Sequence, residues 1–141
     1  MKKTAKTLLI LALTLVMLFT GVPTFAAEAD TGISPRLSHM SGGVFTFSAL
    51  DDGAHVSITY EGYTDSFVRA EVTVKLEKRV MLLFWKDLDT WSATSTELCG
   101  HFYHIFEHDG KGTYKATMTL KVYGTDGTYD VIEDSIQSSY K

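Results

Sequence analysis

Two segments of the chain alternate strictly between apolar and polar residues, and this alternation constrains the fold more than any other feature. In residues 68–77 every second side chain is apolar, namely Val68, Ala70, Val72, Val74 and Leu76. Residues 114–123 repeat the pattern with Tyr114, Ala116, Met118, Leu120 and Val122. A strand sorts such residues onto two faces, whereas a helix would scatter them around a cylinder. Both segments are therefore predicted to be strands of antiparallel sheets with one solvated face.

Shorter segments extend this prediction along the chain. Three of them also have the composition of strands, namely residues 44–50, 55–60 and 129–132. The continuous apolar run of residues 80–85 has strand length and is predicted to be a strand covered on both sides. Turns are expected where Asp and Gly, which tolerate positive φ, occur together, at residues 51–53, 109–112 and 125–128. Seven or eight short strands predict an all-β domain, either a β-sandwich or a small barrel.

The position of Tyr114 favours the sandwich. In the stretch DGKGTY, Tyr114 follows Gly112 by two residues at the start of a predicted strand. This pattern resembles the tyrosine corner of immunoglobulin-like domains, in which the hydroxyl bonds the backbone of the preceding turn. Ala116 stands where antibody domains carry a cysteine, and an ordinary hairpin turn is the alternative. We predict a single immunoglobulin-like antiparallel β-sandwich over residues 39–141, with Trp85, or else Trp91, as the core tryptophan.

The first 26 residues have the composition of a secretory signal peptide. Three lysines precede an apolar run over residues 8–19, and small residues suited to cleavage follow. We expect cleavage after Ala26, with Ala29 as the second possibility, and a flexible lead-in over residues 27–38. The apolar run is short for a membrane span, and no cysteine for lipid attachment follows it. The sequence thus predicts a secreted, extracellular protein with no stable membrane anchor after cleavage.

Charge and cysteine content narrow the expected partners. The chain has a formal net charge of −4, and loss of the leader's lysines would make it more acidic. Scattered acidic charge is unfavourable for binding nucleic acid or anionic membrane surfaces. Cys99 is the only cysteine, so no internal disulfide is expected. Burial as a small apolar residue is the first expectation, and a Cys99-linked dimer or a free thiol are the alternatives.

Several short motifs occur in a characteristic order. They are ISPR at residues 33–36, WKDLDTWS at 85–92, GTY at 112–114, VYG at 122–124 and GTY at 127–129. Their order resembles that of small secreted proteins of Gram-positive, often gut-dwelling, bacteria, a domain family of unknown function. The resemblance implies a single β-sandwich behind a signal peptide and carries no catalytic residues. Members of that family often have a cysteine pair, which this chain lacks.

The stretch CGHFYHIFEH contains the only cysteine and three of the five histidines. In a strand, His101 and His104 point to opposite faces, and only Cys99 and His101 share one. Zinc requires ligands that converge at about 2.0–2.3 Å, which this spacing does not provide. We therefore predict a strand, with no metal and no cofactor. The exception would require a neighbouring strand to bring His39 or His55 beside Cys99 and His101.

Carboxylates suggest the alternative function, a metal-dependent or carboxylate hydrolase. The acidic residues considered for such a site are Asp51, Asp52, Asp87, Asp89, Glu133 and Asp134. Two of them facing each other across a cleft would suit glycoside hydrolysis. Turns and solvated charges explain the same residues, and the chain has no calcium-loop pattern, G-x-S-x-G motif or glycine-rich phosphate loop.

Aromatic residues outnumber the positions on the predicted inner faces. Tyr63 and Trp91 fall in predicted loops, and Tyr103 and Tyr123 fall on predicted outer faces. Exposed Tyr and Trp offer a large apolar area with a polar tip, which suits protein recognition and stacking on sugar rings. Cross-strand pairs that merely stabilise a sheet are the alternative. We predict a non-enzymatic module that binds an extracellular protein or glycan through these four side chains.

Overall fold

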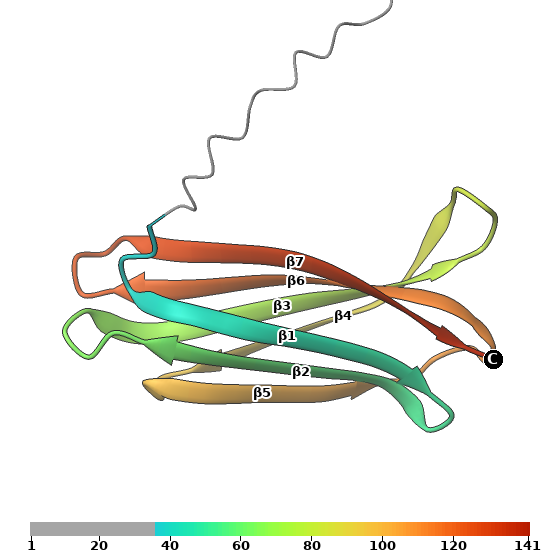
Figure 1. Cartoon of the computed structure of the whole chain (residues 1–141), viewed down its shortest axis with the longest axis horizontal. Helices are drawn as coiled ribbons and strands as arrows, with labels where there is room; N and C mark the ends of the chain where they lie inside the picture. The colour runs from blue at the N-terminus through green and yellow to red at the C-terminus, as the bar shows by residue number, and fades with distance from the viewer. Residues whose placement is uncertain (1–35) are drawn as a thin grey trace, which may run out of the picture. The chain divides into compact units, whose positions relative to one another are not determined.

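The computed structural model describes residues 36–141, which form two antiparallel β-sheets packed face to face (Figure 1). The predicted signal peptide and most of the predicted lead-in lie outside these residues. The seven strands are β1 (Met40–Leu50), β2 (Gly53–Gly62), β3 (Phe67–Arg79), β4 (Trp85–Ser95), β5 (Cys99–Phe106), β6 (Gly112–Gly124) and β7 (Tyr129–Tyr140). Residues 36–141 contain no helix, and therefore none long and apolar enough to cross a membrane.

The order of the strands is that of an immunoglobulin-like sandwich. One sheet has the order β1-β2-β5 and the other has the order β4-β3-β6-β7. All neighbouring strands are antiparallel. In constant-type antibody domains the fourth strand joins the sheet of the first two, whereas here β4 pairs with β3 in the opposite sheet. The predicted fold class is confirmed, and β1 and β5 are the edge strands of the three-stranded sheet.

The two strictly alternating segments form β3 and β6, the central strands of the four-stranded sheet. They pair so that Val72 lies opposite Leu120 and Val74 lies opposite Met118. Their alternating apolar side chains from Ala70 to Leu76 and from Tyr114 to Val122 are buried against the inner faces of β1, β2 and β5. Val68 is 41% exposed at an irregularity in the pairing of β3 with β6, so its predicted place on the inner face is wrong. The other large buried side chains of the core come from β1, β2 and β5 and are Met40, Phe45, Phe47, Val56, Ile58, Tyr60, Phe102 and Phe106. Apart from Val68, alternation therefore predicted the inner faces of β3 and β6 correctly.

Tyr114 is completely buried at the crossover between the two sheets. Its hydroxyl donates to the backbone carbonyl of Gly110, and it also bonds a carboxylate oxygen of Asp109 at 3.1 Å. Lys78 bonds the same carboxylate from β3. The residues between β5 and β6 are thereby held where the chain leaves one sheet for the other. The predicted bond from the tyrosine to the preceding turn is confirmed.

The prediction of a covered strand over residues 80–85 is wrong. β3 ends at Arg79, β4 begins at Trp85, and the residues between them form the tip of the β3–β4 hairpin. In Figure 1 this hairpin projects from the sandwich at the end where the C-terminus lies. A continuous apolar run is typical of a strand that is buried on both faces, which is why the sequence predicted one here. Here those residues are exposed rather than buried.

The prediction of Trp85 as the core tryptophan is also wrong. Trp85 is half-buried at the base of the hairpin tip, with the guanidinium of Arg79 4.9 Å from the centre of its ring. Trp91 lies within β4, not in a loop as predicted, and packs against the core. Its ring stacks on His104 of β5 at 4.6 Å between ring centroids, with an angle of 5° between the ring planes. Trp91 and His104 therefore link the two sheets along one side of the sandwich.

Asp130 closes the opposite side of the sandwich, where β1 and β7 lie next to each other (Figure 1). Its carboxylate accepts backbone N–H groups from Ser38, His39 and Met40 at 2.8, 2.6 and 3.2 Å. Three donors on one carboxylate oxygen fix the start of β1 against β7 without a ladder between the two strands. The end of the predicted flexible lead-in is therefore held in place at Ser38.

Candidate functional site

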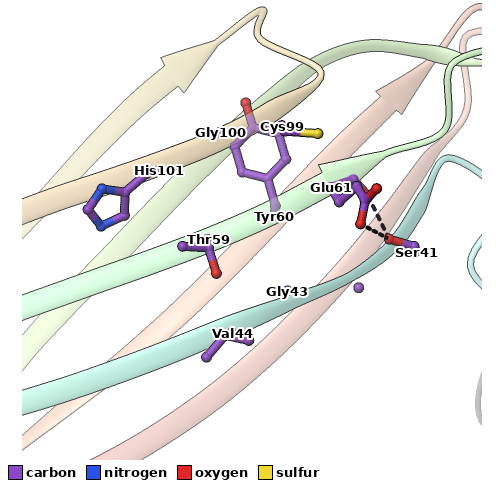
Figure 2. Close-up of a pocket in the computed structure, with 10 residues that line it drawn as sticks. Ser41, Gly43, Val44, Thr59, Tyr60, Glu61, Cys99, Gly100 and His101 are labelled. Carbon is purple, nitrogen blue, oxygen red and sulfur yellow. Dashed lines mark hydrogen bonds between the residues drawn. The ribbon is translucent and has the colours of Figure 1, made fainter.

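An open hollow lies on the outer face of the three-stranded sheet, and Figure 2 shows the residues around it. It has a volume of about 830 Å³. The start of β1, the end of β2 and the start of β5 contribute the lining, which consists of Ser41, Gly42, Gly43, Val44, Thr59, Tyr60, Glu61, Cys99, Gly100 and His101. The hollow is open to solvent, and we take it as the candidate ligand-binding surface.

Three glycines, at positions 42, 43 and 100, line the hollow. Gly42 lies at a β-bulge near the start of β1, where a φ of 153° favours glycine. Gly100 is packed so closely on the ring of Tyr60 that a Cβ there would lie 2.3 Å from ring atoms. Tyr60 is itself buried, and its hydroxyl donates to the carbonyl of Glu97 at 2.7 Å. A Cβ at Gly43 would likewise lie near Leu120 and Ile132 of the opposite sheet. Gly43 and Gly100 therefore allow close packing on the inner side of this sheet, and only at Gly42 would a Cβ meet open space.

The rim of the hollow offers several hydrogen-bonding groups on one face. Thr59 pairs with Val44 on one side and with His101 on the other, so these three side chains form a row across the sheet. Glu61 pairs with Cys99 in the next outward-facing row. Ser41 donates to a carboxylate oxygen of Glu61 at 3.3 Å. A ligand would therefore meet hydroxyl, carboxylate and imidazole groups beside the aliphatic side chain of Val44.

Cys99 is exposed, so the expectation of a buried cysteine is wrong. It is the first residue of β5, an edge strand, and its side chain lies on the outer face opposite Glu61. His101 shares that face, as the spacing of two residues predicted. Exposure is a condition for the predicted Cys99-linked dimer, which stays a prediction.

A chain of hydrogen bonds lies beside the hollow on the same sheet face. His55 Nε2 is 2.8 Å from Asp52 Oδ1, and His55 Nδ1 is 2.7 Å from the hydroxyl of Tyr103. The hydrogen bond from His55 lowers the pKa of the Asp52 carboxyl, so Asp52 is ionised at neutral pH. An ionised Asp52 accepts the Nε2–H, which leaves Nδ1 of a neutral His55 to accept the Tyr103 O–H. The ring of Tyr103 is thereby held in a defined orientation.

His101 has a separate partner on this face. Its Nε2 lies 2.7 Å from Oγ of Ser57, on the central strand of the sheet. The rings of His101 and Tyr103 lie 6.3 Å apart between centroids. The imidazole thus connects the rim of the hollow to the ordered Tyr103 side chain.

The four aromatic residues predicted to bind a ligand are spread over the molecule. Tyr103 is exposed beside the hollow, and Tyr63 is exposed between β2 and β3. Trp91 faces the core. Tyr123 lies on the outer face of the four-stranded sheet, where it donates to Glu71 at 3.0 Å and carries Arg69 over its ring at 3.9 Å. The prediction that Tyr103 and Tyr123 lie on outer faces is confirmed, but the four side chains do not form one patch.

The two histidines considered as additional metal ligands lie away from Cys99 and His101. His39 is buried at the start of β1, with Nε2 2.7 Å from Thr128 Oγ1. His55 is engaged with Asp52 and Tyr103. Across residues 36–141, no three His, Cys, Asp or Glu side chains are placed to hold a metal ion.

The sequence interpretation missed most of the rim, namely Ser41, Val44, Thr59 and Glu61. β1 begins at Met40, four residues before the predicted strand, so Ser41 and both neighbouring glycines had been left outside it. The available signal was the clustering of glycine within β-forming sequence, at positions 42, 43 and 100. Glycine in a strand interior often marks a bulge or a place where another group approaches closely.

No family model, no curated protein and no solved structure matches the chain.

Proposed function

We propose that the protein is a secreted, non-enzymatic module that binds an extracellular glycan or protein on the outer face of the β1-β2-β5 sheet. The observation that carries the proposal is the hollow between β1, β2 and β5, with the oriented and exposed Tyr103 beside it. Export rests on the leader sequence. The resemblance to secreted domains of Gram-positive bacteria is consistent with that location and names no ligand.

A saccharide is the ligand class that suits this surface best. Sugar hydroxyls match the hydrogen-bonding groups of Ser41, Thr59, Glu61 and His101 around the rim. The apolar face of a sugar ring matches an exposed aromatic ring whose polar tip is already bonded, as in Tyr103. The hollow is shallow, so a ligand would lie along the sheet instead of being enclosed.

The proposal is tested by NMR titration of the chain from Ala27 to Lys141 with a panel of soluble bacterial and host glycans. We expect amide shifts confined to the β1-β2-β5 sheet around the hollow, with affinity reduced at least about tenfold by Tyr103→Ala, as for loss of an aromatic anchor. Tyr129→Ala is the matched control, because Tyr129 is as exposed as Tyr103 (50% and 51%) but belongs to the other sheet. Equal loss in both variants, or shifts centred elsewhere, would contradict the proposed surface.

A hydrolase is the second candidate, because Cys99, His101 and Glu61 line the same hollow. A thiol and an imidazole act as nucleophile and base only within hydrogen-bond reach of each other, and His101 Nε2 instead bonds Ser57 at 2.7 Å, so this candidate ranks below the binding module. Turnover of chromogenic ester, peptide or glycoside substrates that is abolished by Cys99→Ser or His101→Gln would favour this candidate over the binding module. Substrate binding without turnover, unchanged in Cys99→Ser, would favour the binding module.

A further inference from the structure

Five consecutive apolar side chains are exposed at the tip of the β3–β4 hairpin. They are Val80, Met81, Leu82, Leu83 and Phe84. Leu82 and Leu83 are the most exposed of them, at 89% and 84%. Single exposed apolar residues are common on protein surfaces, but a contiguous patch rimmed by polar residues marks an interaction site. This surface is separate from the hollow, and its role is independent of the proposed function.

The backbone of the tip is partly satisfied within the hairpin itself. The N–H of Val80 donates to the carbonyl of Phe84 at 3.0 Å, and the N–H of Phe84 donates to the carbonyl of Met81 at 3.4 Å. Unpaired backbone groups are costly in an apolar medium, so internal pairing lowers the cost of placing a turn there. The tip is thus a compact turn whose side chains are all apolar.

The base of the tip carries aromatic and cationic groups. Trp85 lies between Arg79 and Lys115, whose charged groups are 4.9 and 4.6 Å from the centre of its ring. Trp is favoured at membrane–water interfaces, and cations flanking an apolar segment are attracted to anionic headgroups. The segment from Lys78 to Lys86 contains three basic residues and no acidic one, although the whole chain has a net charge of −4.

Two cations at the base of the tip lack an acidic partner among residues 36–141, and one of them, Arg79, donates to the amide oxygen of Gln137 at 3.2 Å. Lys78 and Lys115 are paired with Asp109 and Glu77, respectively. Arg79 and Lys86 are exposed, and within residues 36–141 neither has a carboxylate at ion-pair distance. The average acidity of the chain, which predicted poor binding to anionic surfaces, therefore does not describe the segment from Lys78 to Lys86.

We propose that the hairpin tip inserts into the interface of an anionic lipid bilayer. A protein partner that docks on one side of a hairpin needs only one apolar side, whereas a turn that enters lipid is surrounded by it. The tip has apolar side chains at five consecutive positions, so both sides are apolar. Leu82 and Leu83 would reach deepest, Trp85 would lie at headgroup depth, and Arg79 and Lys86 would contact lipid phosphates.

The test uses the chain from Ala27 to Lys141, which contains all seven strands and the whole described core but lacks the apolar leader. Binding is measured by co-sedimentation with vesicles of phosphatidylglycerol and phosphatidylcholine in equal amounts, and with phosphatidylcholine alone. We expect binding to the anionic vesicles that weakens with added salt. Leu82→Ser with Leu83→Ser should reduce the partition coefficient at least about tenfold, because two large apolar side chains are lost from the lipid.

Matched controls separate the tip from general surface properties. Val68→Ser with Val131→Ser removes two exposed apolar side chains from strand surfaces and should leave binding unchanged. Arg79→Gln with Lys86→Gln should weaken binding, whereas Lys111→Gln with Lys121→Gln, which changes the net charge equally, should not. Tryptophan emission should shift to the blue on binding in wild type and in Trp91→Phe, but not in Trp85→Phe.

Two results would overturn the proposal. One is wild-type protein that fails to bind the anionic vesicles, or that binds them as well after the double leucine substitution. The other is wild-type protein that does not bind vesicles but forms a dimer or a protein complex in sedimentation velocity, if the double leucine substitution abolishes that dimer or complex. That second result would identify a second copy or a protein partner as what covers the tip.

Discussion

The β5 strand and the tip of the β3–β4 hairpin are both rich in apolar and aromatic residues, but they meet their surroundings in opposite ways. In β5, Phe102 and Phe106 are buried while His101 and Tyr103 are exposed. At the hairpin tip, every residue from Val80 to Phe84 is exposed. Alternating apolar and polar side chains indicate a strand with one buried and one solvated face. A continuous apolar run indicates similar surroundings on every side. In a central strand these surroundings are the protein interior, whereas at the hairpin tip they lie outside the protein.

The largest expected effect comes from deleting the same side chain in each region. Phe106 is 1% exposed and Phe84 is 63% exposed. Phe106→Ala should lower the free energy of unfolding by about 3–5 kcal/mol, because it leaves a cavity in the core. Phe84→Ala should change it by no more than about 0.5 kcal/mol. Urea unfolding followed by circular dichroism measures both, and a large loss in Phe84→Ala would show that the tip packs against the protein.

A smaller effect is expected where β5 meets the Tyr60 ring. Gly100→Ala places a methyl group 2.3 Å from ring atoms of a buried side chain, so the ring or the strand must shift. We expect a loss of about 1–3 kcal/mol in the free energy of unfolding, as for overpacked cores. Gly43→Ala is the milder comparison, because its nearest contact is 3.0 Å, to the carbonyl of Thr59. If Gly100→Ala costs no more than Gly43→Ala, the packing of Tyr60 does not limit this edge of the hollow.

Much of the fold could be predicted because local patterns determine it. The alternation in β3 and β6 identified their inner faces, and the position of Tyr114 after Gly112 identified the crossover contact. The prediction of a covered strand over residues 80–85 is wrong because hydrophobic periodicity alone does not distinguish a buried apolar run from an exposed one. The other elements depend on contacts between residues far apart in the sequence. β4 carries a half-exposed pattern with little apolar content, and its pairing with β3 alone makes it a strand.

The candidate site was less predictable than the fold. Tyr103 was placed correctly because its face follows from parity within one strand. Thr59 and Glu61 become neighbours of His101 and Cys99 only through the register of β2 on β5. Register depends on turn geometry and core packing along both strands, so the composition of the rim cannot be derived from any one segment.

Removal of one hydroxyl tests the contact that holds the end of β5. Tyr114→Phe leaves the Gly110 carbonyl without its donor, and we expect a loss of about 1–2 kcal/mol in the free energy of unfolding near neutral pH. Burial raises the pKa of Tyr114, so its neutral form stabilises the fold below pH about 10 and this contribution is lost as pH rises. Stability measured from pH 8 to 11 should therefore fall more steeply in wild type than in Tyr114→Phe. Burial also raises the pKa of Tyr60, but Tyr60 is present in both proteins, so parallel curves would contradict the role of Tyr114.

The smallest effect is a titration on the outer face of the three-stranded sheet, a surface with ordered polar contacts that the hairpin tip lacks. The hydrogen bond from His55 lowers the pKa of Asp52, so the Asp52 carboxylate favours the folded state above the ordinary pKa of Asp, and this preference is lost as pH falls. His55→Gln should raise the midpoint of the Asp52 carboxyl, measured by carbon NMR. His101→Gln removes a histidine from the same face whose partner is Ser57, and it should leave that midpoint in place. Equal shifts in the two variants would mean that the overall charge on this face, and not the hydrogen bond from His55, sets the pKa of Asp52. The hydrogen bonds from Asp52 through His55 would then not explain a fixed orientation of the Tyr103 ring.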